Sequence, residues 1–251
     1  MNCQGRPLAV VKPFIINILN CQGRPLAYNW VVKKRDYKNL SENSIYHIYN
    51  RGNNKENIFY DEQDYRAFLF RLSLSLGIEK DVIDKEPLLR MPKSRIRIAK
   101  SPAGLFKLHS FCLMPNHFHL LLEQCGDKSI SQLMLKICTS FAMYLNKKYN
   151  RVGYVFQDRF KSVLIENNPQ LMWVTSYIHT NPVKDGFNRT PGEYNWSSYN
   201  DFASNRNLPI VYKDLILEIF DTKENFIKQT FALSQTAKGA PWQFDTLKNK
   251  D

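Results

Sequence analysis

Residues 105–123 contain two apolar runs that are joined by only two residues. The runs cover residues 105–114 and 117–123, and Pro115-Asn116 lies between them. Proline and asparagine are typical of tight turns between strands. The pattern therefore predicts two adjacent strands of one sheet.

The segments around this strand pair alternate between strand and helix patterns. Residues 44–50 are rich in β-branched and aromatic side chains and predict a strand that Arg51-Gly52 ends. Asp61 can cap an amphipathic helix that ends at Gly77. Three further elements are predicted: a helix over 129–149 with a capping box at Ser129 and Gln132, a strand over 154–166, and a helix that Asn168-Pro169 opens and Asn181-Pro182 ends. This order predicts an α+β fold with helices packed on one face of an antiparallel sheet.

Patterning divides the chain into three parts. Residues 1–38 form an N-terminal extension in which NCQGRPLA occurs at 2–9 and again at 20–27. Two copies are too few for a solenoid, so we interpret them as duplicated DNA or as a start codon assigned too far upstream. Residues 39–205 form the predicted core, with a basic insertion at 79–103, and residues 206–251 form a C-terminal helical and polar tail.

The charge balance favours a polyanionic partner. Lys and Arg total 35 against 23 acidic residues, a formal net charge of +12, which suits nucleic acid better than a small metabolite. The five cysteines form no CxxC pair, which favours a reducing cytoplasm. The apolar stretch at 8–19 is interrupted by Lys12 and Pro13, so we expect no membrane span.

Two pairs of residues could carry chemistry. His117 and His119 flank Phe118 on a predicted strand, so both imidazoles project from one face as possible metal ligands. Tyr177 and Asn181 are one helical turn apart and share a side of their helix. Each pair also has an ordinary interpretation, since the histidines could lie on a solvated face, and Tyr177 could be a core residue of a helix that Asn181 ends.

Several separated segments resemble the IS200-like single-tyrosine transposases, and among them the REP-associated tyrosine transposase branch. The resemblance spans residues 44–203 and leaves out the duplicated N-terminus and the tail. Its segments are YHIYNRGNNKENIFYDEQDY at 46–65, MPNHFHLLLE at 114–123, VFQDRFKS at 155–162, SYIHTNPVKDG at 176–186 and EYNWSSY at 193–199.

The resemblance implies a ferredoxin-like HUH nuclease core. His117 and His119 match the HUH metal ligands, Tyr177 matches the nucleophile, and Asn181 matches the third ligand. A tyrosine hydroxyl with a pKa near ~10 needs help from a bound cation to attack a phosphodiester. Two histidines alone would suit zinc, whereas the phosphate chemistry and the family favour Mg²⁺ or Mn²⁺. The implied activity is metal-dependent nicking and strand transfer of single-stranded or hairpin DNA through a 5′-phosphotyrosine.

Basic residues outside the site are candidates for phosphate contacts. Aromatic side chains at Tyr154, Phe156 and Trp173 could stack on unpaired bases or pack in the core. Glu123 could orient a metal ligand or end a solvated strand, and we interpret His47 and His179 as structural or surface histidines. The candidate DNA-binding residues are Arg90, Lys93, Arg95, Arg97, Lys147, Lys148, Arg159, Lys161 and Lys184.

Two other functions stay open at this point. A domesticated, catalytically silent protein could bind DNA hairpins with the same scaffold, and a metal-dependent hydrolase could act on small phosphodiesters. The sequence also permits a monomer or a homodimer, with Tyr177 meeting the histidines of its own chain or of a partner.

Overall fold

The fold is seen in a computed structural model that describes residues 40–91 and 98–236. Within these residues four strands form one antiparallel sheet in the order β2-β3-β1-β4. The strands are β1 Ser44–Arg51, β2 Phe106–Met114, β3 His117–Gln124 and β4 Lys161–Leu164. The α-helices are α1 Glu62–Ser75, α2 Lys80–Lys85, α3 Ile130–Lys148, α4 Asn168–Lys184, α5 Tyr199–Ala203, α6 Asp214–Phe220 and α7 Lys223–Thr236, with short 3₁₀ turns at Asn53–Lys55 and Pro191–Glu193.

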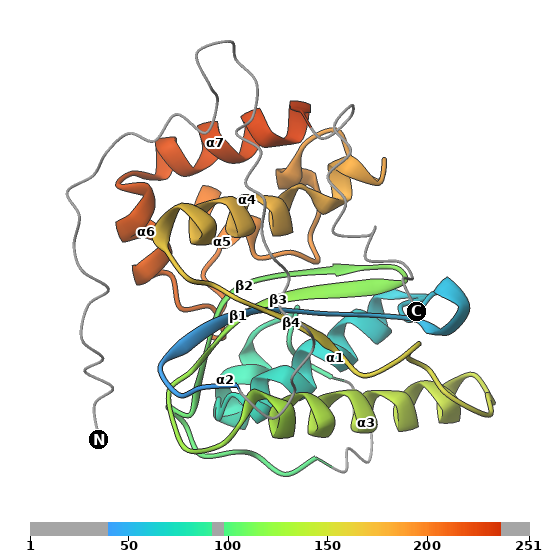
Figure 1. Cartoon of the computed structure of the whole chain (residues 1–251). Coiled ribbons are helices and arrows are strands. Elements are labelled where there is room, and N and C mark those ends of the chain that lie inside the picture. The colour runs from blue at the N-terminus through green and yellow to red at the C-terminus, as the bar shows by residue number, and fades with distance from the viewer. Residues whose placement is uncertain (1–39, 92–97, 237–251) are drawn as a thin grey trace, which may run out of the picture.

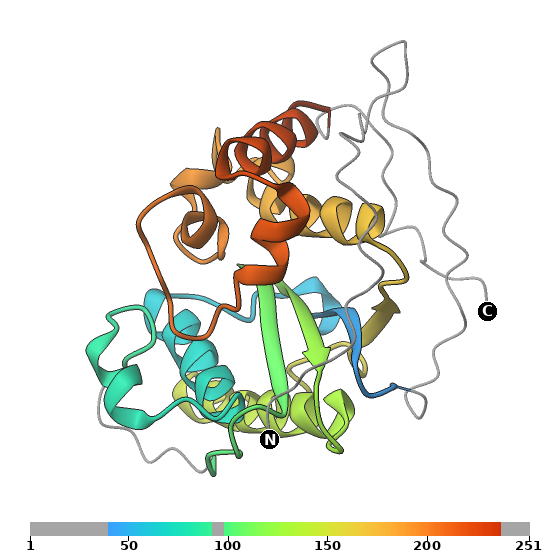
Figure 2. The ribbon, with the colours of Figure 1, turned by 90° about the vertical axis from the view of Figure 1, so that its left-hand side faces the viewer.

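The order β1-α1-β2-β3-α3-β4 is that of a ferredoxin-like fold, and the predicted α+β class is confirmed. Helices α1 and α3 cover one face of the sheet (Figures 1 and 2). Phe118 of β3 points into this layer, where its ring centroid lies 4.9 Å from that of Phe68 on α1. Phe68 in turn contacts Phe141 of α3 at 5.2 Å. Phe118 therefore faces the core, as the strand alternation around it predicts.

Helix α4 lies on the opposite face of the sheet, and α5, α6 and α7 pack around it (Figure 1). Helices therefore cover both faces of the sheet and not only the one face that the sequence predicts. Phe226 of α7 is fully buried and its ring lies 5.1 Å from Phe202 of α5. The helical part of the predicted C-terminal tail is thus packed on the core. The duplicated N-terminal segment lies outside the described residues.

Two elements differ in length from their sequence predictions. The predicted strand over 154–166 is interrupted: Lys161–Leu164 form β4, and Phe156 pairs with Gly52 as an isolated bridge. Between these two parts the Asp158 carbonyl accepts a hydrogen bond from the Asn50 side chain at 3.1 Å. Helix α4 does not end at Asn181-Pro182 but continues to Lys184. Proline cannot donate to the carbonyl four residues earlier, which is that of Ile178, and the side-chain amide of Asn181 donates to that carbonyl instead, at 3.3 Å.

No helix in residues 40–91 or 98–236 combines the length and the apolar character that crossing a bilayer requires.

Candidate active site

Both predicted histidine ligands project from the face of the sheet that α4 covers. In the ladder between β1 and β3, Tyr49 lies opposite His119 and Arg51 lies opposite His117. Residues directly opposite each other share a face of the sheet. The imidazole of His119 is only 5% exposed, whereas His117 is partly buried. Asn116 Oδ1 lies 2.6 Å from His117 Nδ1 and orients that ring.

Tyr177 of α4 meets His119 within the same chain. Their ring centroids are 5.7 Å apart and their planes cross at 84°. Tyr177 is 7% exposed and lies parallel to Trp173, which precedes it by one helical turn, with ring centroids 5.2 Å apart. A second copy of the chain is therefore not needed to bring this tyrosine beside this histidine.

Asn181 is buried one turn after Tyr177, and its side-chain amide donates to two backbone carbonyls of α4. Its Nδ2 donates to the carbonyl of Tyr177 at 2.9 Å and to that of Ile178 at 3.3 Å. These bonds use the amide nitrogen, so the oxygen Oδ1 is the atom that could serve as a ligand.

His47 of β1 is a further member of this cluster. Its Nε2 lies 3.0 Å from His119 Nδ1, and the two rings stack with centroids 5.1 Å apart. The ring centroids of Tyr177 and His47 are 6.1 Å apart, and their planes cross at 76°. The sequence contained a signal for this role, since His47, Tyr49 and Arg51 alternate on one strand and share a face.

Glu123 does not orient His117 or His119, which was one of the two roles that the sequence left open. Its Oε2 lies 2.9 Å from His109 Nε2 and 3.6 Å from Lys107 Nζ, at the other end of β3. The hydrogen bond to His109 and the nearby charge of Lys107 keep the pKa of Glu123 below its usual range, although burial opposes them. His47, not Glu123, is the side chain beside His119.

Burial keeps His47 and His119 neutral. It lowers the pKa of His47 to about 3. The pKa of His119 is held well below its usual range, first by burial and then by the neighbouring His117, His47, Lys184 and Arg51. A histidine must be neutral to bind a metal ion, so these pKa values favour ligation at neutral pH.

Cationic side chains surround the cluster. Lys184 Nζ lies 5.5 Å from the centre of the Tyr177 ring, and Lys161 Nζ lies 5.8 Å from the centre of the Tyr49 ring. Arg51, which the sequence analysis did not single out, lies across from His117. Three positive charges near a tyrosine and two histidines favour a phosphate group at this place.

The remaining predicted DNA-binding residues lie elsewhere. Arg90, Lys147 and Arg159 are exposed. Lys148 forms ion pairs with Asp61 at 2.7 Å and with the buried Asp64 at 2.8 Å. Lys93, Arg95 and Arg97 lie outside the described residues.

The three candidate stacking residues have different surroundings. Tyr154 is 86% exposed, whereas Trp173 is buried against Tyr177. Phe156 packs towards Phe118 and Phe141 in the layer of α1 and α3. Only Tyr154 presents its ring to solvent among these three.

The donor atoms of the site suit a divalent cation if the amide oxygen takes part. In the described part of the chain, no three side chains of His, Cys, Asp or Glu are grouped so that they could hold a metal ion. The predicted set consists instead of the imidazoles of His117 and His119 and the carboxamide of Asn181. Mixed nitrogen and oxygen donors of this kind are compatible with Mn²⁺ and Mg²⁺.

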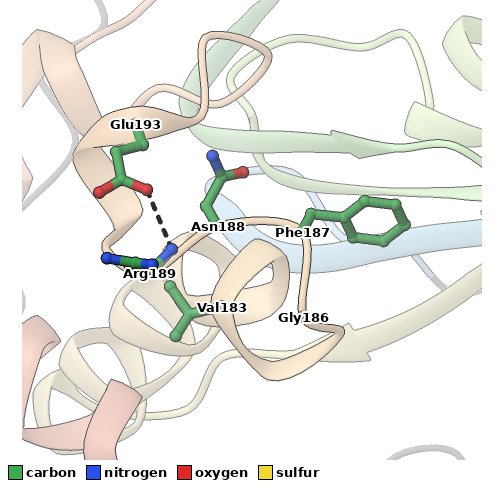
Figure 3. Close-up of a pocket in the computed structure, with 6 residues that line it drawn as sticks. All are labelled: Val183, Gly186, Phe187, Asn188, Arg189 and Glu193. Atoms are coloured by element: carbon green, nitrogen blue, oxygen red, sulfur yellow. Dashed lines mark hydrogen bonds between the residues drawn. The ribbon is translucent and has the colours of Figure 1, made fainter.

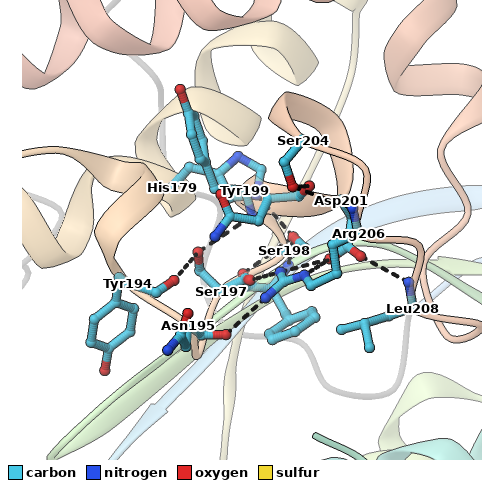
Figure 4. A network of polar contacts seen from close by, with 12 residues as sticks. His179, Tyr194, Asn195, Ser197, Ser198, Tyr199, Asp201, Ser204, Arg206 and Leu208 are labelled. Carbon is cyan, nitrogen blue, oxygen red and sulfur yellow. Dashed lines mark hydrogen bonds and ion pairs between the residues drawn. The ribbon is translucent and has the colours of Figure 1, made fainter. Parts of the chain in front are cut away.

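Helix α4 is attached to the sheet by a buried polar network (Figure 4). His179 Nε2 lies 2.8 Å from Ser198 Oγ, and the same hydroxyl accepts a hydrogen bond from the Phe111 amide of β2 at 2.8 Å. Arg206 secures this loop through an ion pair with the buried Asp201 at 2.8 Å. The network fixes the helix that carries Tyr177 against the strands that carry its neighbours.

An open pocket of about 650 Å³ adjoins the C-terminal end of α4. Phe187, which is 51% exposed, points away from Arg189 and Glu193 on its rim (Figure 3). Neither the two predicted histidine ligands nor Tyr177 and Asn181 line this pocket, which is lined by Val183, Gly186, Phe187, Asn188, Arg189 and Glu193.

Fold and site together define an α+β, ferredoxin-like protein in which His119 on the sheet lies against Tyr177 on a helix. A model of the family described as "Transposase IS200 like" matches residues 41–181, more than half of the chain. The chain belongs to this family, and the resemblance seen in its motifs is confirmed. The matched region contains His117, His119, Tyr177 and Asn181.

Two individual relatives are similar over shorter or more divergent alignments. A curated protein of Haemophilus influenzae, named "Putative REP-associated tyrosine transposase", is 29% identical over 105 residues, which cover 38% of this chain. The alignment spans 59% of that relative's length. A solved structure, of the REP-associated tyrosine transposase bound to a REP hairpin, aligns with a TM-score of 0.48 at 16% identity, covering 71% of this chain and 90% of that chain.

Proposed function

We propose that this protein nicks single-stranded DNA and transfers the strand through a covalent bond to Tyr177. A divalent cation, Mg²⁺ or Mn²⁺, would be held by His117, His119 and Asn181. The observation that carries the proposal is the contact of Tyr177 with His119 inside one chain, in a buried cluster surrounded by cations. Membership of the IS200-like family supports it.

The proposed reaction exchanges one phosphoester bond for another. The Tyr177 hydroxyl loses its proton and attacks the phosphorus, the bond from phosphorus to the 3′ oxygen breaks, and that oxygen leaves as a 3′-hydroxyl after taking up a proton. When bound, the cation supplies Lewis acidity to the phosphate and stabilises the leaving oxygen. The phosphotyrosine linkage conserves the free energy of the phosphodiester bond. A second 3′-hydroxyl can therefore attack it and reseal a strand without ATP.

The chain's own residues would position the reactants. Trp173 holds the Tyr177 ring by stacking, which limits the directions from which the hydroxyl can attack. Lys184 lies near that ring, where a positive charge stabilises the negative charge that develops on the phenolic oxygen. Lys161 and Arg51 line the sheet side of the cluster and would bind the phosphates flanking the scissile bond.

We propose palindromic repeat hairpins as the DNA substrate. The name of the Haemophilus influenzae relative and the net charge of +12 support this class of partner. A cytoplasmic location is part of this proposal, and the bacterial relative supports it, because bacterial chromosomes lie in the cytoplasm. A single chain would suffice for cleavage, because Tyr177 and His119 of one chain are already adjacent.

The test is the formation of a denaturation-resistant adduct. The full chain is incubated with single-stranded hairpin oligonucleotides and Mn²⁺ and analysed on a denaturing gel, with Tyr177→Phe as the variant and the half-exposed Tyr212→Phe as the matched control. We expect the parent and Tyr212→Phe to form the adduct, and Tyr177→Phe to bind hairpins without forming it. An adduct in Tyr177→Phe would assign the nucleophile elsewhere.

The same assay separates the alternative functions. A catalytically silent hairpin-binding protein would retard the oligonucleotide in a native gel but form neither adduct nor cleaved product. A phosphodiester hydrolase would release product without an adduct. Either result would reject the proposed strand transfer.

A further inference from the structure

His47 and His119 are joined by a hydrogen bond, and which of the two rings donates it decides which nitrogen of His119 can bind a cation. We propose that His47 is a positioning residue that accepts a hydrogen bond from Nδ1–H of His119 and so leaves the lone pair of His119 on Nε2. The inference rests on the proposed function, because it assigns His119 as a metal ligand.

A neutral imidazole carries one N–H and one lone pair, on different nitrogens. His47 Nε2 and His119 Nδ1 are 3.0 Å apart and both side chains are buried, so one of these nitrogens must donate to the other. If His119 donates, its Nε2 bears the lone pair that a cation requires. If His119 accepts, its Nε2 bears a proton and cannot ligate. The second nitrogen of a metal-binding histidine usually donates to a neighbouring acceptor, which favours the first arrangement.

The backbone ladder fixes this contact. His47 pairs with Leu121 in the register of β1 and β3, so it is the diagonal neighbour of His119 on the same face. The two rings are inclined by only 23°, and the Tyr177 ring lies nearly perpendicular to both of them. Because the contact joins two central strands, His119 keeps one ring orientation before any cation arrives.

The first experiment reads the tautomer of His119 directly. The full chain contains five histidines, so a ¹⁵N-histidine NMR spectrum can be assigned with single variants. Without metal we expect His119 in the parent to carry its proton on Nδ1, and His47→Phe to shift His119 towards the Nε2–H form. His47→Gln, whose side-chain oxygen can accept the same hydrogen bond, should keep the parental form. A His119 protonated on Nε2 in the parent would overturn the proposal.

The second experiment measures Mn²⁺ affinity without DNA by calorimetry. We expect His47→Phe to weaken binding by roughly 10–100-fold, and His47→Gln to stay within about threefold of the parent. His109→Phe is the matched control, because His109 is an equally buried strand histidine whose partners are Glu123 and the Tyr212 carbonyl. It should lose stability and keep its Mn²⁺ affinity. Unchanged affinity in His47→Phe would overturn the proposal.

These readouts are independent of DNA cleavage. A parent that forms no adduct with hairpin DNA, but shows the expected tautomer and Mn²⁺ affinities, would reject the proposed function and leave the role of His47 intact. An active parent whose tautomer and affinity do not respond to His47→Phe would reject the role of His47 alone.

Discussion

The indole of Trp173 lies parallel to the ring of Tyr177, with their planes 11° apart, and so restricts how the phenol can turn. Trp173→Ala opens a space beside the nucleophile, and we expect the rate of adduct formation to fall by roughly 10–100-fold, because small misplacements of reacting atoms are costly. Single-turnover kinetics with a hairpin oligonucleotide measure this rate. Trp173→Phe keeps an aromatic surface and should lose much less. Equal rates in the parent and Trp173→Ala would show that stacking does not position Tyr177.

Asn181 donates hydrogen bonds within α4 and is also the third proposed metal ligand, and substitutions should separate these two roles. Asn181→Ala removes the donor to the Tyr177 and Ile178 carbonyls, so we expect the free energy of unfolding to fall by about 1–3 kcal/mol, together with a loss of Mn²⁺ affinity. Asn181→Asp also removes the donor but retains an oxygen ligand, so Mn²⁺ should raise its melting temperature more than that of Asn181→Ala. Thermal unfolding with and without Mn²⁺ measures both. The same Mn²⁺ response in both variants would exclude the side-chain oxygen as a ligand.

His179 should make stability depend on pH. Burial, with a smaller effect of Arg206, lowers its pKa from 6.5 to about 3. Between these two pH values the unfolded chain binds a proton at His179 and the folded chain does not. The contribution of His179 to the free energy of unfolding is therefore complete above pH 6.5 and declines as the pH falls towards 3. The decline is at most about 1.4 kcal/mol per pH unit.

His179→Gln should flatten this dependence. Because His47 titrates in the same direction, the quantity to compare is the difference between parent and variant in urea unfolding at about pH 7 and about pH 5. A pH dependence in His179→Gln as steep as that of the parent would show that His179 is already protonated in the folded protein or that its surroundings open to water.

Lys148 and Lys184 should respond differently to neutralisation. Lys148→Met leaves the buried Asp64 without its ion pair, so we expect the free energy of unfolding to fall by about 1–3 kcal/mol and the salt dependence of DNA binding to stay unchanged. Lys184→Met should leave the free energy of unfolding nearly unchanged and reduce the slope of the salt dependence of DNA binding by about one. The exposed Lys147→Met is a stability control. A reduced slope in Lys148→Met would support the phosphate contact that the sequence indicated.

Helix caps and tight turns could be predicted from the sequence, because they depend on neighbouring residues. Asp61 caps α1 in a capping box with Asp64, and the turn at Pro115-Asn116 joins β2 and β3 as expected. The continuation of α4 past Pro182 could not be predicted from the proline alone, because it depends on a hydrogen bond from the Asn181 side chain. Helix-breaking rules describe the backbone and omit such compensation.

Contacts between distant segments were harder to predict. Periodicity placed Tyr177 on a helix and His119 on a strand, but it could not tell which face of the sheet that helix covers. The family resemblance implies the pairing, and in the structure the two rings lie together. The contact of His47 with His119 could not be predicted, because a single histidine on a strand has no distinguishing pattern until its neighbour in the ladder is known.

The hydrogen bond from Asn181 to the Tyr177 carbonyl joins the third proposed ligand to the backbone of the proposed nucleophile. Turning the phenol about its own side-chain torsions would break the stack on Trp173 but leave this backbone hydrogen bond intact. A movement of α4 would instead carry the tyrosine and the amide together. The stack on Trp173 is therefore the contact that would hold a DNA end joined to Tyr177 beside Asn181.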